Sequence, residues 1–183
     1  MSPSFCIVDE FHKANYLTTA DSIAPKLLGS KSVNSLRLTE IAKGNGFETP
    51  AQVSVPMTIP LSILMTQDRD KYRELMQSLD SCGMWKVPLE REKMIAFLKE
   101  IYLDNPKLIE LSQAIEQTIS GKKETSLVAV RSSSTLEDLS KMAGAGLFDS
   151  ILNVTLHDME GLKKSIIDVW ISLYTERAII SRK

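Results

Sequence analysis

One stretch, residues 127–154, constrains the fold of this chain most. A short apolar run at 127–130 has the length and composition of a buried strand and leads directly into Arg131. Polar residues and a small-residue loop follow: Ser132, Ser133, Ser134, Glu137, Asp138, Ala143, Gly144, Ala145 and Gly146. Polar side chains directly after a buried strand usually lie at a sheet edge that a ligand can reach. An arginine fork suits phosphate oxygens and a Gly/Ala loop admits an anion to backbone N–H groups, so the segment predicts most of a phosphate-binding site.

The middle of the chain is predicted to be helical. Three successive stretches place apolar residues at helical spacing, which indicates three helices that each turn one face to the core. The apolar positions are Tyr72, Leu75, Met76 and Leu79, then Met94, Phe97, Leu98 and Ile101, then Leu108, Leu111, Ile115 and Ile119. Asn105 followed by Pro106 is a typical start for the third helix.

Shorter patterns surround this helical middle. Residues 5–8, 52–55 and 147–154 read as strands, and residues 31–43 read as a helix. In that helix Leu36, Leu38 and Ile41 are expected to face inward. A last, long helix is predicted from about residue 158 to the end, with this apolar stripe: Leu162, Ile166, Val169, Trp170, Leu173 and Tyr174. Strands and helices together indicate an α/β fold of the mixed α+β kind.

Composition excludes several classes of function. The chain has 183 residues, which suits one domain, and its formal net charge of −1 argues against a broad nucleic-acid surface. No apolar run approaches the roughly 20 residues that a membrane span needs, so no membrane association is expected. Neither a nucleophile-elbow motif nor a zinc-protease motif occurs, so hydrolase chemistry has no support. We expect a soluble, intracellular protein; the sequence does not distinguish cytoplasm from plastid.

Four blocks of the chain carry a family resemblance: residues 29–36, 49–60, 127–154 and 169–183. Together they strongly resemble the nucleotide-binding domain of the dikinases that form a phosphohistidine, a group that includes pyruvate phosphate dikinase and phosphoenolpyruvate synthase. Within that group, the pairing of residues 142–154 with 169–183 is most similar to the glucan and phosphoglucan water dikinases, which phosphorylate starch-like glucans.

The resemblance implies a domain organisation. Residues 1–26 would be a lead-in connector, and residues 27–183 would be the first half of an ATP-grasp-like nucleotide-binding domain, with a helical segment at 57–125. The last helical pattern runs to the final residues without a clear stop, which predicts a fragment or a separately expressed piece.

The resemblance also suggests which residues contact nucleotide. Arg131 would hold ATP phosphate oxygens; its alternative role is a structural ion pair with Glu137 or Asp138. Lys31 would contact nucleotide from the start of its helix, where N–H groups favour anions; its alternative fate is a solvated surface lysine.

The small-residue loop and its flanking hydroxyls are further candidates. The resemblance places Gly144, Ala145, Gly146 and Ser150 around the phosphates, while a plain turn is the alternative for Gly144. Ser132, Ser133 and Thr135 would contact phosphate or cap a turn through their hydroxyls. Glu137 and Asp138 are expected to orient Arg131. No metal ligand is assigned, because the family holds magnesium mainly through carboxylates from the other half of the domain.

The resemblance implies the reaction of a longer enzyme. ATP would give its β-phosphate to a histidine on another domain and its γ-phosphate to water, and the histidine would then phosphorylate an acceptor. A glucan is the first expectation for that acceptor, and an enzyme of the phosphoenolpyruvate synthase or antibiotic phosphotransferase type is the alternative. His12 and His157 do not lie in a phosphohistidine motif, so the chain should need a phosphohistidine domain and the remaining half of the ATP domain. A different alternative is a non-catalytic interaction module, which would show an exposed apolar patch on residues 158–183.

Overall fold

The computed structural model describes residues 5–9, 14–16, 25–120, 127–133 and 148–181. In chain order the elements are β1 (Phe5–Asp9), β2 (Ala14–Tyr16), α1 (Pro25–Asn45), β3 (Val53–Ser54), α2 (Thr58–Gln67), α3 (Arg69–Ser81), η2 (Met84–Lys86), α4 (Val87–Leu103), α5 (Pro106–Ser120), β4 (Leu127–Arg131), β5 (Ser150–Thr155), α6 (Met159–Ile171), η3 (Ser172–Tyr174) and α7 (Glu176–Ile180). The predicted mixed α/β class is confirmed, with helices in the majority.

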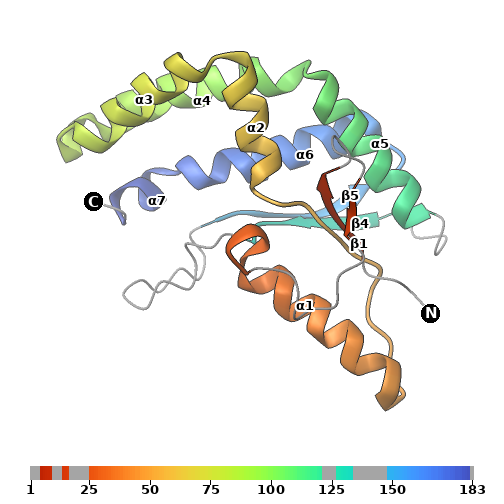
Figure 1. The fold of residues 1–183 in the computed structure, drawn as a ribbon. Helices are drawn as coiled ribbons and strands as arrows, with labels where there is room; N and C mark the ends of the chain where they lie inside the picture. Colours follow the sequence, from red (N-terminus) through yellow and green to blue (C-terminus); the bar gives the residue numbers. More distant parts are fainter. Residues whose placement is uncertain (1–4, 10–13, 17–24, 121–126, 134–147, 182–183) are drawn as a thin grey trace.

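The elements are arranged in layers. Helices α3, α4 and α5 arch over α6, the β4–β5 pair lies beneath α6, and α1 lies on the far side of that pair (Figure 1). A second small sheet has the order β2-β1-β3, in which β1 runs antiparallel to β2 and parallel to β3. The β4–β5 pair is thus the layer between the helical body and α1.

The helical body is built on the periodicity that the sequence shows. One apolar cluster joins α2 to α6, and the three predicted stripes supply much of it. The Asn105 side chain accepts a hydrogen bond from the backbone N–H of Lys107 at 3.0 Å, which confirms it as the cap of α5. Tyr102 and Trp170 meet edge to face with ring centroids 5.1 Å apart, which ties α4 to α6. Within the described residues, no helix combines the length and the apolar character that a bilayer crossing requires.

The β4–β5 pair contains a bulge. Val130 lies opposite Ile151, whereas Val128 lies opposite Val154, so β5 holds one extra residue across this step. Asn153, with a φ of 57°, lies within the extra length. Simple alternation would put Ile151 and Val154 on opposite faces. The bulge lets both pack against the helical body.

The strand at 127–130 is half-exposed, and the prediction that it is buried was wrong. Val128 and Val130 pack against the helical core, while Leu127, Ala129 and Arg131 are exposed on the alternate positions. One face of the pair is therefore covered by α6, and Arg131 lies on the other face.

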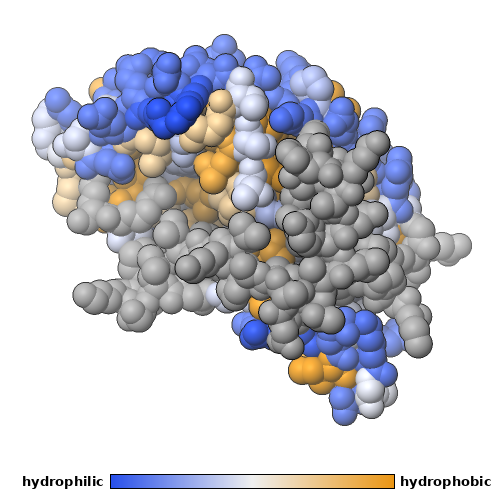
Figure 2. Space-filling model, in the orientation of Figure 1, coloured by the Kyte–Doolittle hydropathy of each residue, from blue (hydrophilic) through white to orange (hydrophobic). Residues whose placement is uncertain are grey.

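The inward face of α1 also differs from the prediction. Leu36 is buried as expected, but Leu38 is 49% exposed and Ile41 is 55% exposed. The buried positions follow a spacing of three, at Val33, Leu36, Thr39 and Ala42. Part of α1 projects from the body, and its surface there is partly apolar (Figure 2). The prediction from apolar residues alone failed because α1 touches the body along a narrow strip. That strip includes Thr39, and the larger Leu38 and Ile41 lie outside it.

The predicted long C-terminal helix is broken in two. α6 ends before η3, and α7 follows after Thr175. The buried Ser172 side chain accepts a hydrogen bond from the backbone N–H of Asp149 at 3.1 Å, which fixes the helix end to the start of β5. Thr175 then caps α7 by accepting from the N–H of Ala178 at 3.2 Å. Hydroxyl capping outweighs the continuous apolar stripe at this point.

Candidate functional site

The start of α1 meets the end of β4 at a glycine. Gly29 interrupts α1 with φ 73° and ψ 160°, a backbone conformation that is essentially restricted to glycine. A Cβ at this position would lie 2.3 Å from the carbonyl oxygen of Ser133, the second residue after β4. The two backbones can approach so closely only because residue 29 has no side chain.

The hydroxyl of Ser133 joins the two segments across this contact. Its oxygen accepts a hydrogen bond from the backbone N–H of Ser32 at 2.9 Å and donates one to the carbonyl of Leu28 at 2.5 Å. Ser133 therefore spans the break at Gly29, with one partner on each side of it. For Ser32 it acts as a helix cap supplied from a distant part of the chain.

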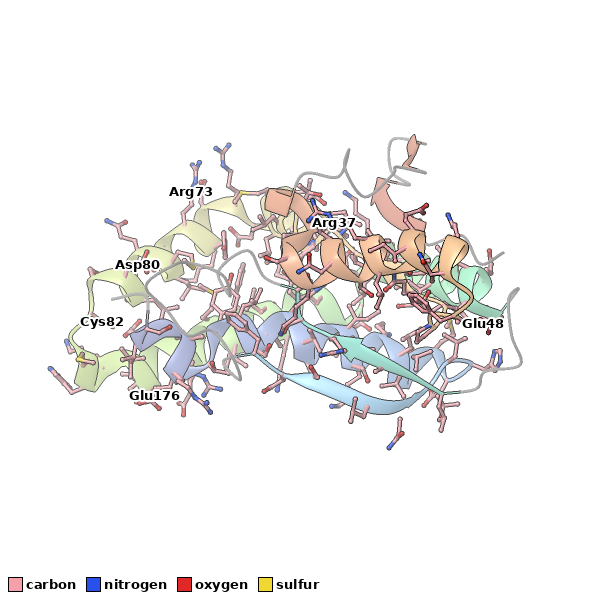
Figure 3. The ribbon with its side chains drawn as sticks, turned by 90° about the horizontal axis from the view of Figure 1, so that it is seen from below. Arg37, Glu48, Arg73, Asp80, Cys82 and Glu176 are labelled. Atoms are coloured by element: carbon pink, nitrogen blue, oxygen red, sulfur yellow. The ribbon has the colours of Figure 1, made fainter. Side chains whose placement is uncertain are left out.

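This contact brings the two predicted cations to one place. Lys31 lies between Gly29 and Ser32, and both of those residues contact Ser133. Arg131 lies two residues before Ser133, at the end of β4. Both Lys31 and Arg131 are exposed. Seen from below, the start of α1 lies beside β4, with Arg37 farther along the helix and Glu48 beyond its end (Figure 3).

Two further predicted residues belong to this edge. Ser150 is the direct cross-strand partner of Arg131 and is exposed. Ser132 is only 6% exposed, so its side chain has a structural place inside the fold and is not a surface group. The structure therefore brings together the segments that carry Lys31, Arg131 and Ser150, and it buries Ser132. The remaining predicted site residues lie outside the described residues: Glu137, Asp138, Gly144, Ala145 and Gly146.

The edge is electrostatically suited to an anion. Residues 28–33 and 127–133 contain Lys31 and Arg131 and no acidic residue. On the neighbouring strand, the acidic residue Asp149 comes directly before Ser150, the first residue of β5. The two described segments therefore carry two positive charges between them, although the whole chain has a net charge of −1.

A cavity of about 360 Å³ has Asp149 in its lining, and its charges are balanced. It is lined by Arg91 and Lys99 from α4 and by Asp149 and Asp168 as carboxylates. The Nε of Arg91 already donates to the carbonyl of Tyr174 at 3.0 Å. Because positive and negative groups cancel there, the cationic edge is the better candidate for a phosphate.

The residues that the structure describes do not form a metal site. No three histidine, cysteine or acidic side chains within that part of the chain lie close enough to hold an ion. Lys31 and Arg131 are cations and cannot ligate one. The described donors at this edge therefore fit phosphate oxygens and do not fit magnesium.

Sequence patterns missed the role of Ser133. The hydroxyls of Ser132, Ser133 and Thr135 indicated capping of a turn or contact with phosphate, but the helix that Ser133 caps lies 101 residues earlier in the chain. Two sequence features mark the places that meet at Ser133: Gly29, and the end of the strand at Arg131. Neither periodicity nor spacing links these two segments.

Comparisons with known proteins give a family for most of the chain. Residues 25–183 match the pyruvate phosphate dikinase AMP/ATP-binding domain. The rifampicin phosphotransferase of Bacillus subtilis is 30% identical over 159 residues, which cover 85% of this chain and 17% of that protein. No solved structure gives a significant match.

Two further relatives share parts of the same region. A rifampicin phosphotransferase from a Streptomyces species is 35% identical over 89 residues, covering 49% of this chain and 10% of that protein. A probable phosphoenolpyruvate synthase of Methanocaldococcus jannaschii is 27% identical over 157 residues, covering 79% of this chain and 13% of that protein. The chain thus spans 17% or less of the length of these three curated relatives.

Proposed function

Because the chain belongs to the family of pyruvate phosphate dikinase AMP/ATP-binding domains, we propose that it holds the phosphates of ATP at the edge where β4 meets α1. The observation that carries this proposal is the close contact between Gly29 and Ser133, which sets Lys31 and Arg131 at one edge. ATP binding as such follows from the family; the residues that perform it are the proposal.

Each residue has a part that its chemistry suits. The guanidinium of Arg131 would make a charge-assisted, two-pronged contact with phosphate oxygens. The ammonium of Lys31 would add a mobile point charge. Ser150, opposite Arg131, would offer a hydroxyl, and the loop that precedes it would supply backbone N–H groups from Gly144, Ala145 and Gly146. Glu137 and Asp138 would orient Arg131.

Magnesium would reach this site with the nucleotide. The described edge offers no carboxylate set for it, so the ion would be held by the phosphates and by carboxylates outside the described residues. When bound, it would neutralise phosphate charge; the residues of this chain would position the phosphates.

The complete reaction would need further domains. The β-phosphate of ATP would pass to a histidine on a phosphohistidine domain, the γ-phosphate would pass to water, and the histidine would then phosphorylate the acceptor. Such transfers depend mainly on positioning and charge neutralisation. We infer that residues 27–183 are the N-terminal part of the ATP-binding domain and supply one side of the ATP site. The remaining half of that domain would supply the other side. Alone, the chain would bind nucleotide weakly and catalyse nothing.

The acceptor is the least constrained part of the proposal. The resemblance of residues 142–154 and 169–183 to the glucan water dikinases favours a starch-like glucan. The matched relatives are named for rifampicin and phosphoenolpyruvate instead, and this specific observation favours the antibiotic or phosphoenolpyruvate type as the second candidate. Offering the complete enzyme a glucan, rifampicin and pyruvate with ATP would decide between them.

A purely non-catalytic interaction module receives less support. That alternative predicted an exposed apolar patch on residues 158–183. The structure buries most of that stripe, including Leu162, Ile166 and Trp170. The ATP-binding proposal therefore has the better physical basis.

Calorimetric titration of the purified chain with magnesium ATP, beside adenosine, tests the proposal. Phosphate recognition predicts measurable heat with ATP and none with adenosine at the same concentration. A folded chain that binds neither, or binds both equally, would contradict it. Phosphorylation of a glucan or of itself by the isolated chain would contradict the claim that it is inactive alone.

A further inference from the structure

We propose that Ser133 is a positioning residue, which holds Lys31 and Arg131 at a fixed separation so that both cations act on one phosphate chain. The inference rests on the proposed function and assigns a role to a residue that would not itself touch ATP. Its basis is the geometry between the start of α1 and the end of β4.

The first step is the reach of the Ser133 hydroxyl. A hydroxyl has one donor and two acceptor positions, and Ser133 uses one of each. It accepts from the N–H of Ser32, 101 residues away in sequence, and donates to the carbonyl of Leu28, 105 residues away. One side chain therefore ties both sides of the Gly29 break to the strand end. Without it, the first turn that carries Lys31 loses its direct link to β4.

The second step concerns the N–H groups at this helix start. A helix N-terminus can bind an anion through its unpaired N–H groups. Here the N–H of Ser32 is already occupied by Ser133 at 2.9 Å. The positive charge that these two segments can offer to a phosphate therefore comes from the side chains of Lys31 and Arg131. Because Ser133 occupies this N–H group, the group is not available to a ligand. By joining the two segments, Ser133 would also fix the spacing of the two side chains.

The third step is that the contact cannot be shifted easily. Gly29 lies against the Ser133 backbone, and a Cβ there would also meet the Ser133 hydroxyl oxygen at 2.8 Å. The glycine conformation and the hydroxyl bonds fix the same junction from two sides. Preorganised charges bind a ligand more tightly than mobile ones, because less freedom is lost on binding.

A double-mutant cycle tests positioning against simple destabilisation. Magnesium ATP is titrated into the wild-type chain, Ser133→Ala, Lys31→Ala and the double variant. Loss of the hydroxyl should weaken ATP binding by on the order of tenfold in the wild-type background. In the Lys31→Ala background the same change should cost much less, because the group that Ser133 positions is gone. Ser112→Ala, which removes a buried hydroxyl bond inside α5, is the matched control and should leave affinity unchanged.

Two results would overturn the inference while leaving ATP binding intact. One is an equal loss in both backgrounds, and the other is no loss in Ser133→Ala. A wild-type chain that does not bind ATP would instead contradict the proposed function. Amide exchange at Ser32 then decides the junction alone: exchange that is slow in the wild type and fast in Ser133→Ala supports it, and equal exchange in the two proteins overturns it.

Discussion

Arg131 combines a surface position with a fixed backbone. It ends β4, pairs with Ser150 across the sheet and has its side chain exposed. Arg131→Ala should therefore weaken binding of magnesium ATP by about 1.5–3 kcal/mol, the contribution of a charge-assisted contact. The melting temperature should change little, because the side chain is not part of the core. Calorimetry and a thermal melt measure the two effects.

Arg73 provides the control for that experiment. It is exposed on α3, in the helical layer away from the start of α1 (Figure 3). Arg73→Ala removes the same charge from the whole molecule but not from the proposed site. Equal loss of affinity in the two variants would show that ATP responds to net charge and not to Arg131.

Gly29 gives a second prediction at the level of one residue. Gly29→Ala should reduce the free energy of unfolding by at least about 1–3 kcal/mol, because φ 73° with ψ 160° strains any side chain. The new Cβ would also push Ser133 away. Gly44→Ala is the matched control, since a Cβ at position 44 meets nothing within 4 Å. It should be neutral or stabilise α1 by up to about 1 kcal/mol. Urea unfolding of both variants checks the difference, and equal effects would contradict the close contact.

Sequence reasoning supplied the charged residues of the candidate site and missed the contact that joins their segments. Arg131 and Ser150 were candidates because both lie at the ends of short strands in one continuous stretch. Lys31 was a candidate from its place near a helix start and from the family resemblance. The contact through Ser133 was not predictable, because its partners depend on how residues 28–32 dock on a strand about 100 residues later. Local patterns carry no information about that docking.

Among the elements, the middle helices follow the sequence and the last helix does not. α3, α4 and α5 turn the apolar stripes that their periodicity indicates toward the core, with Met76, Phe97 and Ile101 only partly buried. The pattern after residue 158 is equally apolar, yet side-chain hydrogen bonds at Ser172 and Thr175 end one helix and start another. Periodicity reports which face is buried, but it does not report where a hydroxyl competes with the helix.

Ser172 links the broken helix to the strand that bears Ser150. Its buried hydroxyl accepts from the N–H of Asp149 and donates to the carbonyl of Val169 at 2.7 Å. Ser172→Ala leaves the N–H of Asp149 without this acceptor and should cost on the order of 1–3 kcal/mol of unfolding free energy. Ser165→Ala is the control, since its hydroxyl bonds only a carbonyl within α6, that of Gly161, and should cost less than about 1 kcal/mol. Chemical denaturation measures both; a larger cost for Ser165→Ala would argue against the link.

The pairing of α3 with α4 should be sensitive to acid. Hydrogen bonds from Lys93 and then from Ser78 lower the pKa of Glu90 below its ordinary value of 4.5. Because the pKa is lower in the folded state, Glu90 stabilises the fold fully above about pH 4.5 and loses this effect as the pH falls through the folded-state value. The stability gap between wild type and Glu90→Gln should therefore be widest near neutral pH and shrink in acid. Urea unfolding of both proteins at a series of pH values measures this gap, and a gap that stays constant with pH would contradict the role of Glu90.

Across the molecule as a unit, the helical body covers one face of the β4–β5 pair, and α1 lies on part of the other face (Figure 1). α6 and the helical body cover the side of Val128 and Val154. The other side exposes Arg131 and also Leu152, which is 65% exposed. A partly open face with cations at its end and apolar residues along it is consistent with a nucleotide held between this chain and the proposed remaining half of the domain.

Mapping ATP on the chain by NMR would test the phosphate site at the end of β4 without any substitution. Amide shifts of the labelled protein are recorded during titration with magnesium ATP. A site at this edge predicts that the shifts concentrate at residues 29–33, 131–133 and 150, the three segments that meet there. Shifts confined to the helical layer of α3 and α4, or spread without preference over the surface, would contradict a phosphate site at this edge.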